Sequence, residues 1–401
     1  MKYAIILPDG AADQPLPQLH GRTPLEAARI PNMDWIATHG RQGRAVTVPD
    51  GFIPGTDVGT LTVFGYDPHR YYSGRAPIEA AAQSLQAAPD ELIFRCNFVT
   101  ITEGRMRDFT ADHIAQTEAN RLIADLNTLV QAGESTFAGC RFYSGVTYRN
   151  LMIANQAADM KLKCAPPHDI PNEPVAKHQP HGNGEQRVQA IMQRAAEMLR
   201  DHEINHARKQ AGRPLVSDIW LWGQGRPVAL PSFEQRFGAR GAAITGVDII
   251  RGLALSMGMN LLHVDGVTGY LDTNYAGKGA AAARALDDYD LIVVHVEAPD
   301  EASHQGSPEE KITALERTDE HVVGPLLEYL RRQKDWRILV APDHYTLCST
   351  TAHDATPPPF CFAGSDVAPA AGLTFNEHNA EQTGWLINPG WEMIEHFFGT
   401  R

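Results

Sequence analysis

Three short apolar runs, each followed by an aspartate, constrain the fold of this chain more than any other feature of its sequence. The runs are rich in β-branched residues, show no polar alternation, and read YAIILPD, LIVVHVEAPD and RILVAPDH. Continuous runs of this kind are typical of strands buried on both faces of a parallel sheet. We therefore predict strands over residues 3–7, 291–296 and 337–340, with a further candidate at 219–222.

Helical patterns alternate with these runs along the chain. They cover residues 23–40, 185–202 and 308–332. Alternation of strands and helices is expected of a parallel sheet with helices on both faces. The predicted fold class is therefore α/β, with a mostly parallel sheet flanked by helices.

A region with a different order of strand-like and helical segments predicts a smaller α+β domain inserted into the larger one. At 401 residues the chain exceeds the size at which a single core usually keeps growing. The strand-like and helical segments of the smaller region are 92–101, 112–132, 141–143 and 151–154. We place the first part of the main domain at 1–88, the inserted cap domain at 89–175, and the second part of the main domain at 176–401.

Composition excludes several classes of protein. The chain carries 35 Lys and Arg against 48 Asp and Glu, a formal net charge of -13, which argues against a nucleic-acid or anionic-membrane partner. Its five scattered cysteines lack a C-x-x-C spacing, so they indicate neither a disulfide framework nor a thiolate metal site. No signal-peptide pattern and no apolar run of ~20 residues is present. We expect a cytoplasmic protein, with a monomer as the default because no heptad pattern is evident.

The residues that follow the three runs are of the types that bind metal ions. In open parallel sheets, ligands bind beyond the carboxyl ends of the strands. Asp9, Asp300 and Asp343 are therefore expected to converge, although they lie far apart in the sequence. A single aspartate after a strand is usually a turn or helix-capping residue, but three together favour a metal site.

Three histidines accompany these aspartates. His304 follows Asp300 with a D-x-x-x-H spacing, which puts both side chains on one helix face; His344 is adjacent to Asp343, and His353 lies in TTAHDATPPP. Carboxylate and imidazole ligands together suit Mn²⁺, Zn²⁺ or similar ions, and this set is large enough for two. Two metals roughly 3.5 to 4 Å apart can stabilise the attacking and leaving oxygens of a phosphoryl transfer.

The segment PDGFIPGTDVGTL contains a candidate nucleophile, Thr56. Pro54 and Gly55 predict a tight turn, after which Thr56 would open a helix whose free backbone N–H groups favour an anion. A hydroxyl held by a metal at that position can lose its proton and attack phosphorus. The alternative is that Thr56 is only a helix N-cap, a common use of threonine.

Beyond these separate signals, the chain resembles the archaeal-type cofactor-independent, that is 2,3-bisphosphoglycerate-independent, phosphoglycerate mutases of the alkaline-phosphatase superfamily. The resemblance runs nearly end to end, through segments such as IPGTDVGTLTVFGYDP, YYSGRAPIEAA, GVTYRNLM, IWLWGQGRP and HVEAPDEASH. It implies an alkaline-phosphatase-like fold and two divalent metals, Mn²⁺ first, with Mg²⁺, Co²⁺ or Zn²⁺ as alternatives. It implies one metal held by Asp9, Thr56, Asp343 and His344, and the other by Asp300, His304 and His353.

The same resemblance implies a small phosphorylated substrate. Its phosphoryl group would move to Thr56, the glycerate would turn over inside the cap, and the group would return to the other hydroxyl, interconverting 3- and 2-phosphoglycerate. Arg149 and Arg251 are candidate partners of the substrate carboxylate and phosphate, and Lys278 is a candidate partner of a substrate anion. Each could instead be an ordinary surface residue. Members of the family usually carry serine where this chain has Thr56.

Other functions stay open at this point. A related branch with similar segments is proposed to act as homoserine kinases, and simple phosphatase action is a further enzymatic alternative. A metal-dependent regulatory protein, in which Thr56 has abolished turnover, is an alternative from a different class.

Three further signals are given structural interpretations. His202 and His206 form an H-E-x-x-H motif, but the surrounding segment is polar, so we predict a solvated helix end. Lys278 lacks the spacing of a Walker phosphate loop, and His295 lies inside an apolar strand, where a hydrogen-bonded core histidine is expected.

Overall fold

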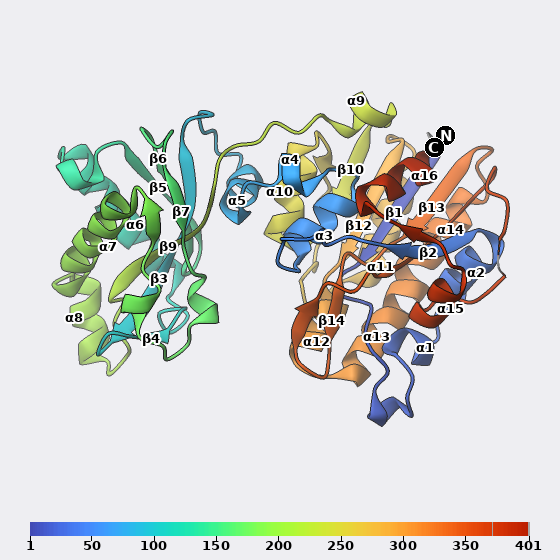
Figure 1. Cartoon of the computed structure of the whole chain (residues 1–401), viewed down its shortest axis with the longest axis horizontal. Helices are drawn as coiled ribbons and strands as arrows, with labels where there is room; N and C mark the ends of the chain where they lie inside the picture. Colours follow the sequence, from blue (N-terminus) through green and yellow to red (C-terminus); the bar gives the residue numbers. More distant parts are fainter. Residues whose placement is uncertain (371, 400–401) are drawn as a thin grey trace. The chain divides into compact units, whose positions relative to one another are not determined.

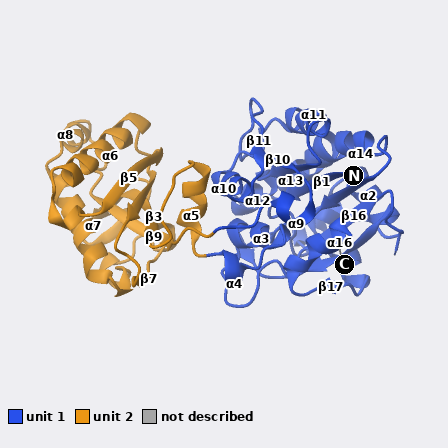
Figure 2. Cartoon of the chain, turned by 90° about the horizontal axis from the view of Figure 1, so that it is seen from above, with its two compact units in different colours: residues 1–72, 229–401 blue, residues 73–228 orange. Residues whose placement is uncertain are grey.

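The chain divides into two compact units in the computed structural model, which describes residues 1–370 and 372–399. Unit 1 is formed by Met1–Tyr72 and Ala229–Arg401, and unit 2 is the intervening Ser73–Val228 (Figure 2). Within the described residues, none of the helices combines the length and the apolar character that a membrane span requires.

Unit 1 is built on an eight-stranded sheet with the order β11-β10-β12-β1-β13-β16-β2-β17 (Figure 1). The five strands from β11 to β13 are parallel to one another, β16 is antiparallel to both of its neighbours, and β17 is parallel to β2. The predicted mostly parallel sheet is thus confirmed. The strands are β1 (Lys2–Pro8), β2 (Arg41–Ala45), β10 (Gly241–Ile244), β11 (Asn260–Leu261), β12 (Leu291–Val296), β13 (Trp336–Val340), β16 (Pro359–Gly364) and β17 (Leu386–Ile387).

The central strand β1 shows why these runs are apolar throughout. Ile5 pairs in register with Val293 of β12 on one side and with Leu339 of β13 on the other. Both faces of β1 are buried, since Ala4 and Ile6 contact the helix-covered core on one face while Ile5 is equally inaccessible on the other. A strand in this position has no solvent-facing side, which accounts for the absence of polar alternation.

Helices cover the sheet of unit 1, as Figure 1 shows. The predicted helix over 23–40 is in fact two, because the chain leaves helical geometry before Pro31, as residues preceding proline tend to do. The predicted helix over 308–332 is continuous but contains a π-helical turn. The helical elements are η1 (Pro17–Leu19), α1 (Pro24–Ala27), α2 (Pro31–His39), α3 (Thr56–Val63), α4 (Pro68–Tyr71), α9 (Phe233–Phe237), α10 (Asp248–Ser256), α11 (Tyr275–Ala285), α12 (Ala298–His304), α13 (Pro308–Thr318), η5 (Asp319–Val323), α14 (Gly324–Leu330), α15 (Glu377–Gln382), η6 (Gly390–Glu392) and α16 (Met393–Phe398). A small hairpin of β14 (Tyr345–Leu347) and β15 (Ala352–Asp354) follows β13.

Unit 2 is an α+β unit with its own core. Its antiparallel sheet runs β4-β3-β6-β5, and β9 also pairs with β3. The strands are β3 (Leu92–Thr102), β4 (Arg105–Asp108), β5 (Cys140–Val146), β6 (Arg149–Ala154) and β9 (Asp218–Gly225), with a separate pair β7 (Lys161–Lys163) and β8 (His181–Asn183). The helical elements are α5 (Arg75–Ala82), α6 (Gln116–Gln131), η2 (Ser135–Phe137), η3 (Pro167–Asp169), η4 (Val175–Lys177), α7 (Glu185–Arg200) and α8 (Glu203–Gln210).

The boundaries of unit 2 are wider than the predicted 89–175. The segment 219–222 forms a strand, but its partner is β3 of the inserted unit, with Leu221 opposite Cys96. The buried faces of α7 and β9 belong to the same core as β3. The sequence indicated these elements correctly. Which strand pairs with which depends on residues far apart in the chain, and a local sequence pattern does not predict it.

Candidate metal centre

Three neighbouring strands of unit 1 bring three aspartates to one edge of the sheet. Asp9 follows β1, Asp300 lies in the first turn of α12 just after β12, and Asp343 follows β13. Since β1 lies between β12 and β13, the three carboxylates converge as predicted. All three are buried, with exposed fractions of 0, 3 and 1%.

The first group of possible ligands is Asp300, His304 and His353. The helix α12 places His304 Nε2 3.1 Å from Asp300 Oδ2, and β15 places His353 Nε2 3.5 Å from Asp300 Oδ1. The two imidazole Nε2 atoms are 3.0 Å apart. These are the three residues that the family resemblance assigned to one metal.

The backbone orients both imidazole rings in a way that suits a metal. His304 Nδ1 lies 2.9 Å from the Thr351 carbonyl oxygen, and His353 Nδ1 lies 3.2 Å from the Pro54 carbonyl oxygen. A carbonyl only accepts hydrogen bonds, so each Nδ1 carries a hydrogen, and the lone pair of each Nε2, which a proton or a metal ion can occupy, faces Asp300. Hydrogen bonding to Asp300 raises the pKa of His304 to about 9, so a proton and a metal ion compete for that lone pair.

The second group of possible ligands is Asp9, Asp300 and His344. His344 Nε2 lies 3.3 Å from Asp9 Oδ1, and this oxygen is buried without a hydrogen-bond partner. His344 Nδ1 lies 3.2 Å from the Tyr345 carbonyl oxygen, which again leaves Nε2 as the free nitrogen. Asp300 is therefore common to both groups.

Asp343, the third carboxylate ligand implied by the resemblance, lies slightly farther from His344 than Asp9 does. Its Oδ2 lies 3.6 Å from His344 Nε2 and accepts a hydrogen bond from Thr60 Oγ1 at 3.0 Å. The amide of Gly10 donates to its other oxygen at 3.3 Å. These donors hold the carboxylate beside the second group.

The electrostatics of the cluster favour a cation. Burial raises the pKa of Asp9 well above its ordinary range, and the negative charges of Asp343, Glu297 and Asp300 raise it further. Several buried carboxylates without an equal number of cations are costly to ionise. Divalent ions bound by oxygen and imidazole nitrogen would remove this cost, so the residues present fit the metals that the resemblance implies.

Thr56 lies at the margin of the same cluster. It is the first residue of α3, the preceding Gly55 occupies the N-cap position without a side-chain cap, and Thr56 Oγ1 is 3.4 Å from His344 Nε2. Thr56 is therefore not the N-cap of α3. Its hydroxyl lies at the start of α3, where free helix N–H groups favour an anion.

His295 and Glu297 are parts of the site that sequence reasoning did not assign to it. His295 is a buried, hydrogen-bonded histidine as expected, but the partner of its Nε2 is Asp9 Oδ2 at 2.7 Å, while its Nδ1 lies 3.1 Å from Thr245 Oγ1. Burial lowers the pKa of His295 to about 3, so the neutral ring orients Asp9. Glu297 completes a third group with Asp9 and His295, and burial, reinforced by Asp300, raises its pKa to about 8.

Two smaller residues also shape the cluster. Thr346 Oγ1 donates to Asp300 Oδ1 at 2.5 Å. Gly10 has a φ of +56°, and a Cβ there would lie 2.5 Å from Asp300 Oδ1 and from Thr346 Oγ1. Only glycine fits this position. The occurrence of Gly10 directly after Asp9 was a signal in the sequence that could have pointed to this close packing.

The three predicted substrate-binding residues have different surroundings. Arg149 is an exposed residue at the start of β6 in unit 2, and Arg251 is a partly exposed residue of α10 in unit 1, 3.8 Å from Asp248. Lys278 is only 1% exposed, and its Nζ donates to the His295 carbonyl oxygen at 2.8 Å. Burial lowers the pKa of Lys278 to about 8. Lys278 thus contacts the strand behind the metal-ligand cluster.

The H-E-x-x-H motif has a structural role in unit 2. His202 Nδ1 accepts a hydrogen bond from the Ile204 amide as the N-cap of α8, and its Nε2 lies 2.9 Å from Asp125. Its two ring nitrogens are therefore engaged in packing the helix. That the motif is not a zinc site stays a prediction.

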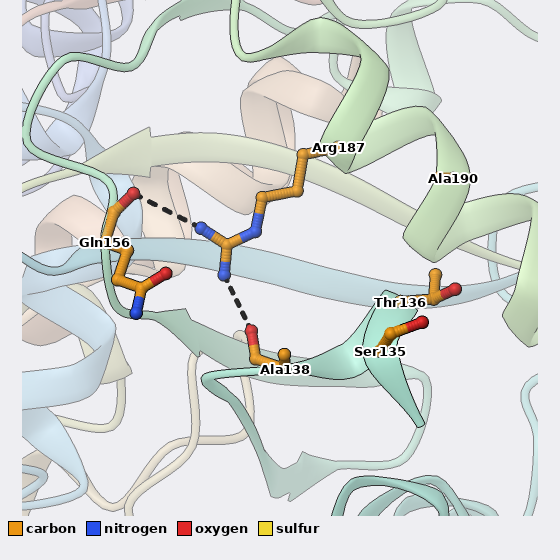
Figure 3. A pocket seen from close by; sticks show the side chains of 6 residues that line it. All are labelled: Ser135, Thr136, Ala138, Gln156, Arg187 and Ala190. Carbon is orange, nitrogen blue, oxygen red and sulfur yellow. Dashed lines mark hydrogen bonds between the residues drawn. The ribbon is translucent and has the colours of Figure 1, made fainter. Parts of the chain in front are cut away.

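Unit 2 also contains a hollow of about 460 Å³, where Arg187 makes contacts that hold the local structure together (Figure 3). The guanidinium of Arg187 lines it and donates to the carbonyl oxygens of Ala138, Asn155 and Gln156 at 2.9, 2.7 and 3.4 Å. Arg187 therefore ties two loops together.

Comparison with known proteins identifies the family. The model of the 2,3-bisphosphoglycerate-independent phosphoglycerate mutase family matches residues 37–205. A 2,3-bisphosphoglycerate-independent phosphoglycerate mutase of Methanothrix thermoacetophila is 44% identical over 395 residues, which cover 98% of each chain. This chain belongs to the 2,3-bisphosphoglycerate-independent phosphoglycerate mutase family. Another member, from Methanothermobacter thermautotrophicus, is 45% identical over 92% of this chain and 90% of its own.

Two solved structures share the fold of this chain. A protein from Pyrococcus horikoshii is 26% identical and superposes with a TM-score of 0.80, covering 99% of this chain and 96% of its own. The cofactor-independent phosphoglycerate mutase of Thermoplasma acidophilum has the same fold, with a TM-score of 0.67 over the full length of both chains at 24% identity. The fold of this chain is thus found in other solved proteins.

Proposed function

We propose that this protein interconverts 3-phosphoglycerate and 2-phosphoglycerate without 2,3-bisphosphoglycerate, through a phosphorylated Thr56. The observation that carries the proposal is the position of the Thr56 hydroxyl, which opens α3 and lies 3.4 Å from His344 Nε2 in a cluster of buried carboxylates and imidazoles. Its support from outside the structure is the set of relatives bearing this name, two of which match over 90% or more of both chains.

Two divalent ions are part of the proposal. We assign one to Asp300, His304 and His353, and the other to Asp9, Asp343, His344 and Thr56. When bound, they supply Lewis-acid stabilisation of charge on the transferring phosphoryl group and lower the pKa of a ligated hydroxyl. Mn²⁺ is our first choice for the ion, with Mg²⁺, Co²⁺ and Zn²⁺ as alternatives, because all of these accept mixed oxygen and nitrogen ligands.

The chain's own residues account for the covalent step. Thr56 Oγ loses its proton and forms a bond to phosphorus, the bond from phosphorus to the substrate oxygen breaks, and that oxygen gains a proton. The N–H groups at the start of α3 stabilise the phosphothreonine dianion. The reverse transfer delivers the phosphoryl group to the other hydroxyl of glycerate.

The remaining roles follow from what this route requires. Water must be kept from phospho-Thr56, or the enzyme would be a phosphatase. Guanidinium groups would hold the anionic groups of the substrate, with Arg149 and Arg251 as our candidates. Lys278 would stabilise β12, the strand that carries His295, through its hydrogen bond to the His295 carbonyl oxygen. We place the reaction in the cytoplasm.

Phosphorus NMR tests the proposal directly. The Mn²⁺-loaded protein is incubated with 3-phosphoglycerate, without ATP and without bisphosphoglycerate, and the expected product is 2-phosphoglycerate. Inorganic phosphate alone would indicate a phosphatase. Failure to convert 3-phosphoglycerate, together with ATP-dependent phosphorylation of homoserine, would replace the mutase by the kinase alternative.

A further inference from the structure

Unit 1 contains a pocket of about 470 Å³ that is separate from the metal centre. Its walls come from the segment before α1, from α1 itself, and from β2, β14 and α15, all of which can be followed in Figure 1. Among the described residues that line it, none is a proposed metal ligand. Its volume lies within the range of roughly 300 to 1,000 Å³ that is usual for small-molecule sites.

The strand β14 separates this pocket from the metal-ligand cluster. His344, just before the strand, and Thr346 face the cluster, and Thr346 Oγ1 lies 3.1 Å from His344 Nδ1. Tyr345 lies between them in the chain, so its side chain points to the opposite side of the strand. There it lines the pocket.

The Tyr345 hydroxyl is available to a ligand. The residue is only 6% exposed, and within the part of the chain that the structure describes no hydrogen bond involves its hydroxyl. A buried tyrosine usually finds a partner for this group, because a phenol both donates and accepts a hydrogen bond. The pocket therefore contains a polar group whose hydrogen-bonding capacity the chain does not use.

The pocket is also lined by four carboxylate side chains, two of which have cationic partners. Asp13 Oδ2 lies 3.0 Å from Lys311 Nζ, and Glu381 Oε1 lies 2.9 Å from an Arg44 guanidinium nitrogen. These two negative charges are therefore balanced by the chain itself.

The other two carboxylates, those of Glu26 and Glu377, form no ion pair with any described residue. Glu377 is 8% exposed, and its oxygens accept hydrogen bonds from the Asp13 amide at 3.0 Å and from Thr23 Oγ1 at 2.6 Å. Glu26 Oε2 accepts from the Thr23 amide at 2.8 Å. These bonds fix both carboxylates, yet each retains acceptor capacity, since a carboxylate has about four lone-pair sites.

A cation in the pocket would offset the cost of ionising Glu377. Burial raises the pKa of this residue to about 7, although the hydrogen bonds from Thr23 and Asp13 act in the opposite direction. An opposite charge close to a buried carboxylate favours its ionised form. The pocket is much larger than a single metal ion, and Pro15 and the ring of Tyr345 offer apolar surface beside the carboxylates.

We propose that this pocket binds a small aliphatic amine in its protonated form, with Glu26, Glu377 and the Tyr345 hydroxyl as the hydrogen-bond acceptors. An ammonium group carries three N–H donors and a positive charge, and its hydrocarbon chain can contact the apolar part of the wall. A compound with two ammonium groups matches the two carboxylates that lack a cation. The inference goes beyond the proposed function and does not rest on it.

Calorimetric titration of the full-length, Mn²⁺-loaded protein with 1,4-diaminobutane at pH 8 tests this site, because added Mn²⁺ keeps the metal centre occupied. We expect one diamine to bind per chain. Glu26→Gln removes one charge while glutamine can preserve the capping box with Thr23, and it should weaken binding by at least about tenfold. The matched control is Glu309→Gln, an exposed glutamate in the first turn of α13. Its affinity should stay within about twofold of the unchanged protein.

A second variant and a second probe separate a built site from general attraction to an acidic protein. Tyr345→Phe keeps the ring and removes only the hydroxyl, so it should weaken binding by about tenfold. Tetramethylammonium carries a positive charge without an N–H donor and should not displace the diamine. The proposal would be overturned by absence of binding at on the order of 10 mM diamine, by equal affinities of the Glu26 and Glu309 variants, by an unchanged affinity of Tyr345→Phe, or by displacement with tetramethylammonium. Each of these results is independent of isomerase activity.

Discussion

The Nε2 atoms of His304 and His353 lie 3.0 Å apart, and both face the carboxylate of Asp300. Each ring donates its Nδ1 hydrogen to a backbone carbonyl, so two nitrogen lone pairs converge on one point. Two lone pairs held in this way repel each other unless a proton or a metal ion lies between them. The backbone carbonyls therefore hold the two imidazole rings in an arrangement that favours a bound cation.

Replacement of His353 by alanine is expected to remove one of the two metal ions, because it deletes a ligand of the group that contains Asp300. Elemental analysis after gel filtration measures this as the loss of one Mn²⁺ per chain, with a large loss of turnover. His206→Ala, which alters the H-E-x-x-H motif of unit 2, is the matched control and should keep the full complement. Equal metal contents in the two variants would remove His353 from the site.

Thr56→Ala is expected to abolish the phosphorylated enzyme while leaving metal binding largely intact. Turnover should fall by on the order of 10³-fold or more, as for the loss of a covalent nucleophile. Mass spectrometry of acid-quenched protein incubated with 3-phosphoglycerate measures the added phosphoryl group. Thr56→Ser keeps the hydroxyl and should retain both the adduct and activity; if the alanine variant turned over at a similar rate, covalent catalysis would be excluded.

The buried pair Lys311 and Asp13 is expected to be important for the stability of unit 1. Both residues are inaccessible, and Lys311 Nζ contacts Asp13 Oδ2 at 3.0 Å and the Thr346 carbonyl oxygen at 2.8 Å. Lys311→Met leaves the Asp13 charge buried and alone, which should lower the free energy of unfolding by about 3 to 5 kcal/mol. Urea unfolding measures this loss.

The double variant Asp13→Asn with Lys311→Met provides the control for that experiment. It removes both charges, so it should be more stable than Lys311→Met alone. No difference between the two variants would show that the loss comes from packing of the lysine stem rather than from the unpaired charge.

Glu377 is expected to make the stability of unit 1 depend on pH. It is 8% exposed, and burial raises its pKa to about 7, although Thr23 Oγ1 donates to its Oε2 at 2.6 Å. Because the pKa is raised in the folded state, the stabilising contribution is complete below about pH 4.5 and is lost as the pH rises through about 7. The loss amounts to about 3 kcal/mol.

Glu377→Gln removes this titration and should flatten the pH dependence. Urea unfolding at pH 5 and pH 8 compares the two proteins, and the difference between the two pH values should be smaller for the variant. A pH dependence that is unchanged by the substitution would assign the titration to another group.

The three strands and their aspartates could be predicted because the relevant signals are local. A strand with no solvent-facing side must be apolar throughout, and the first polar residue after it marks the sheet edge, as Asp9 does after β1. Thr56 was recognisable for a similar reason, since the Pro-Gly turn before it and the helix after it are adjacent in the chain.

Other parts of the site depend on contacts that the local sequence does not contain. His295 has the apolar neighbours of any core residue, and only the pairing of β12 with β1 places it against Asp9. The local sequence around Lys278 is typical of an exposed lysine, yet the packing of α11 buries the side chain against β12. The same limit explains why β9 could be identified as a strand but not assigned to the sheet of unit 2.

The order of the strands has a consequence for synthesis on the ribosome. β1 is made before unit 2, whereas its partners β12 and β13, at Leu291–Val296 and Trp336–Val340, are made after it, and the last of the proposed metal ligands along the chain is His353. Unit 2, by contrast, is one continuous segment with its own core. Nascent chains should therefore complete the inserted unit while β1 still lacks both of its sheet neighbours, and the metal centre can form only when most of the chain has been made.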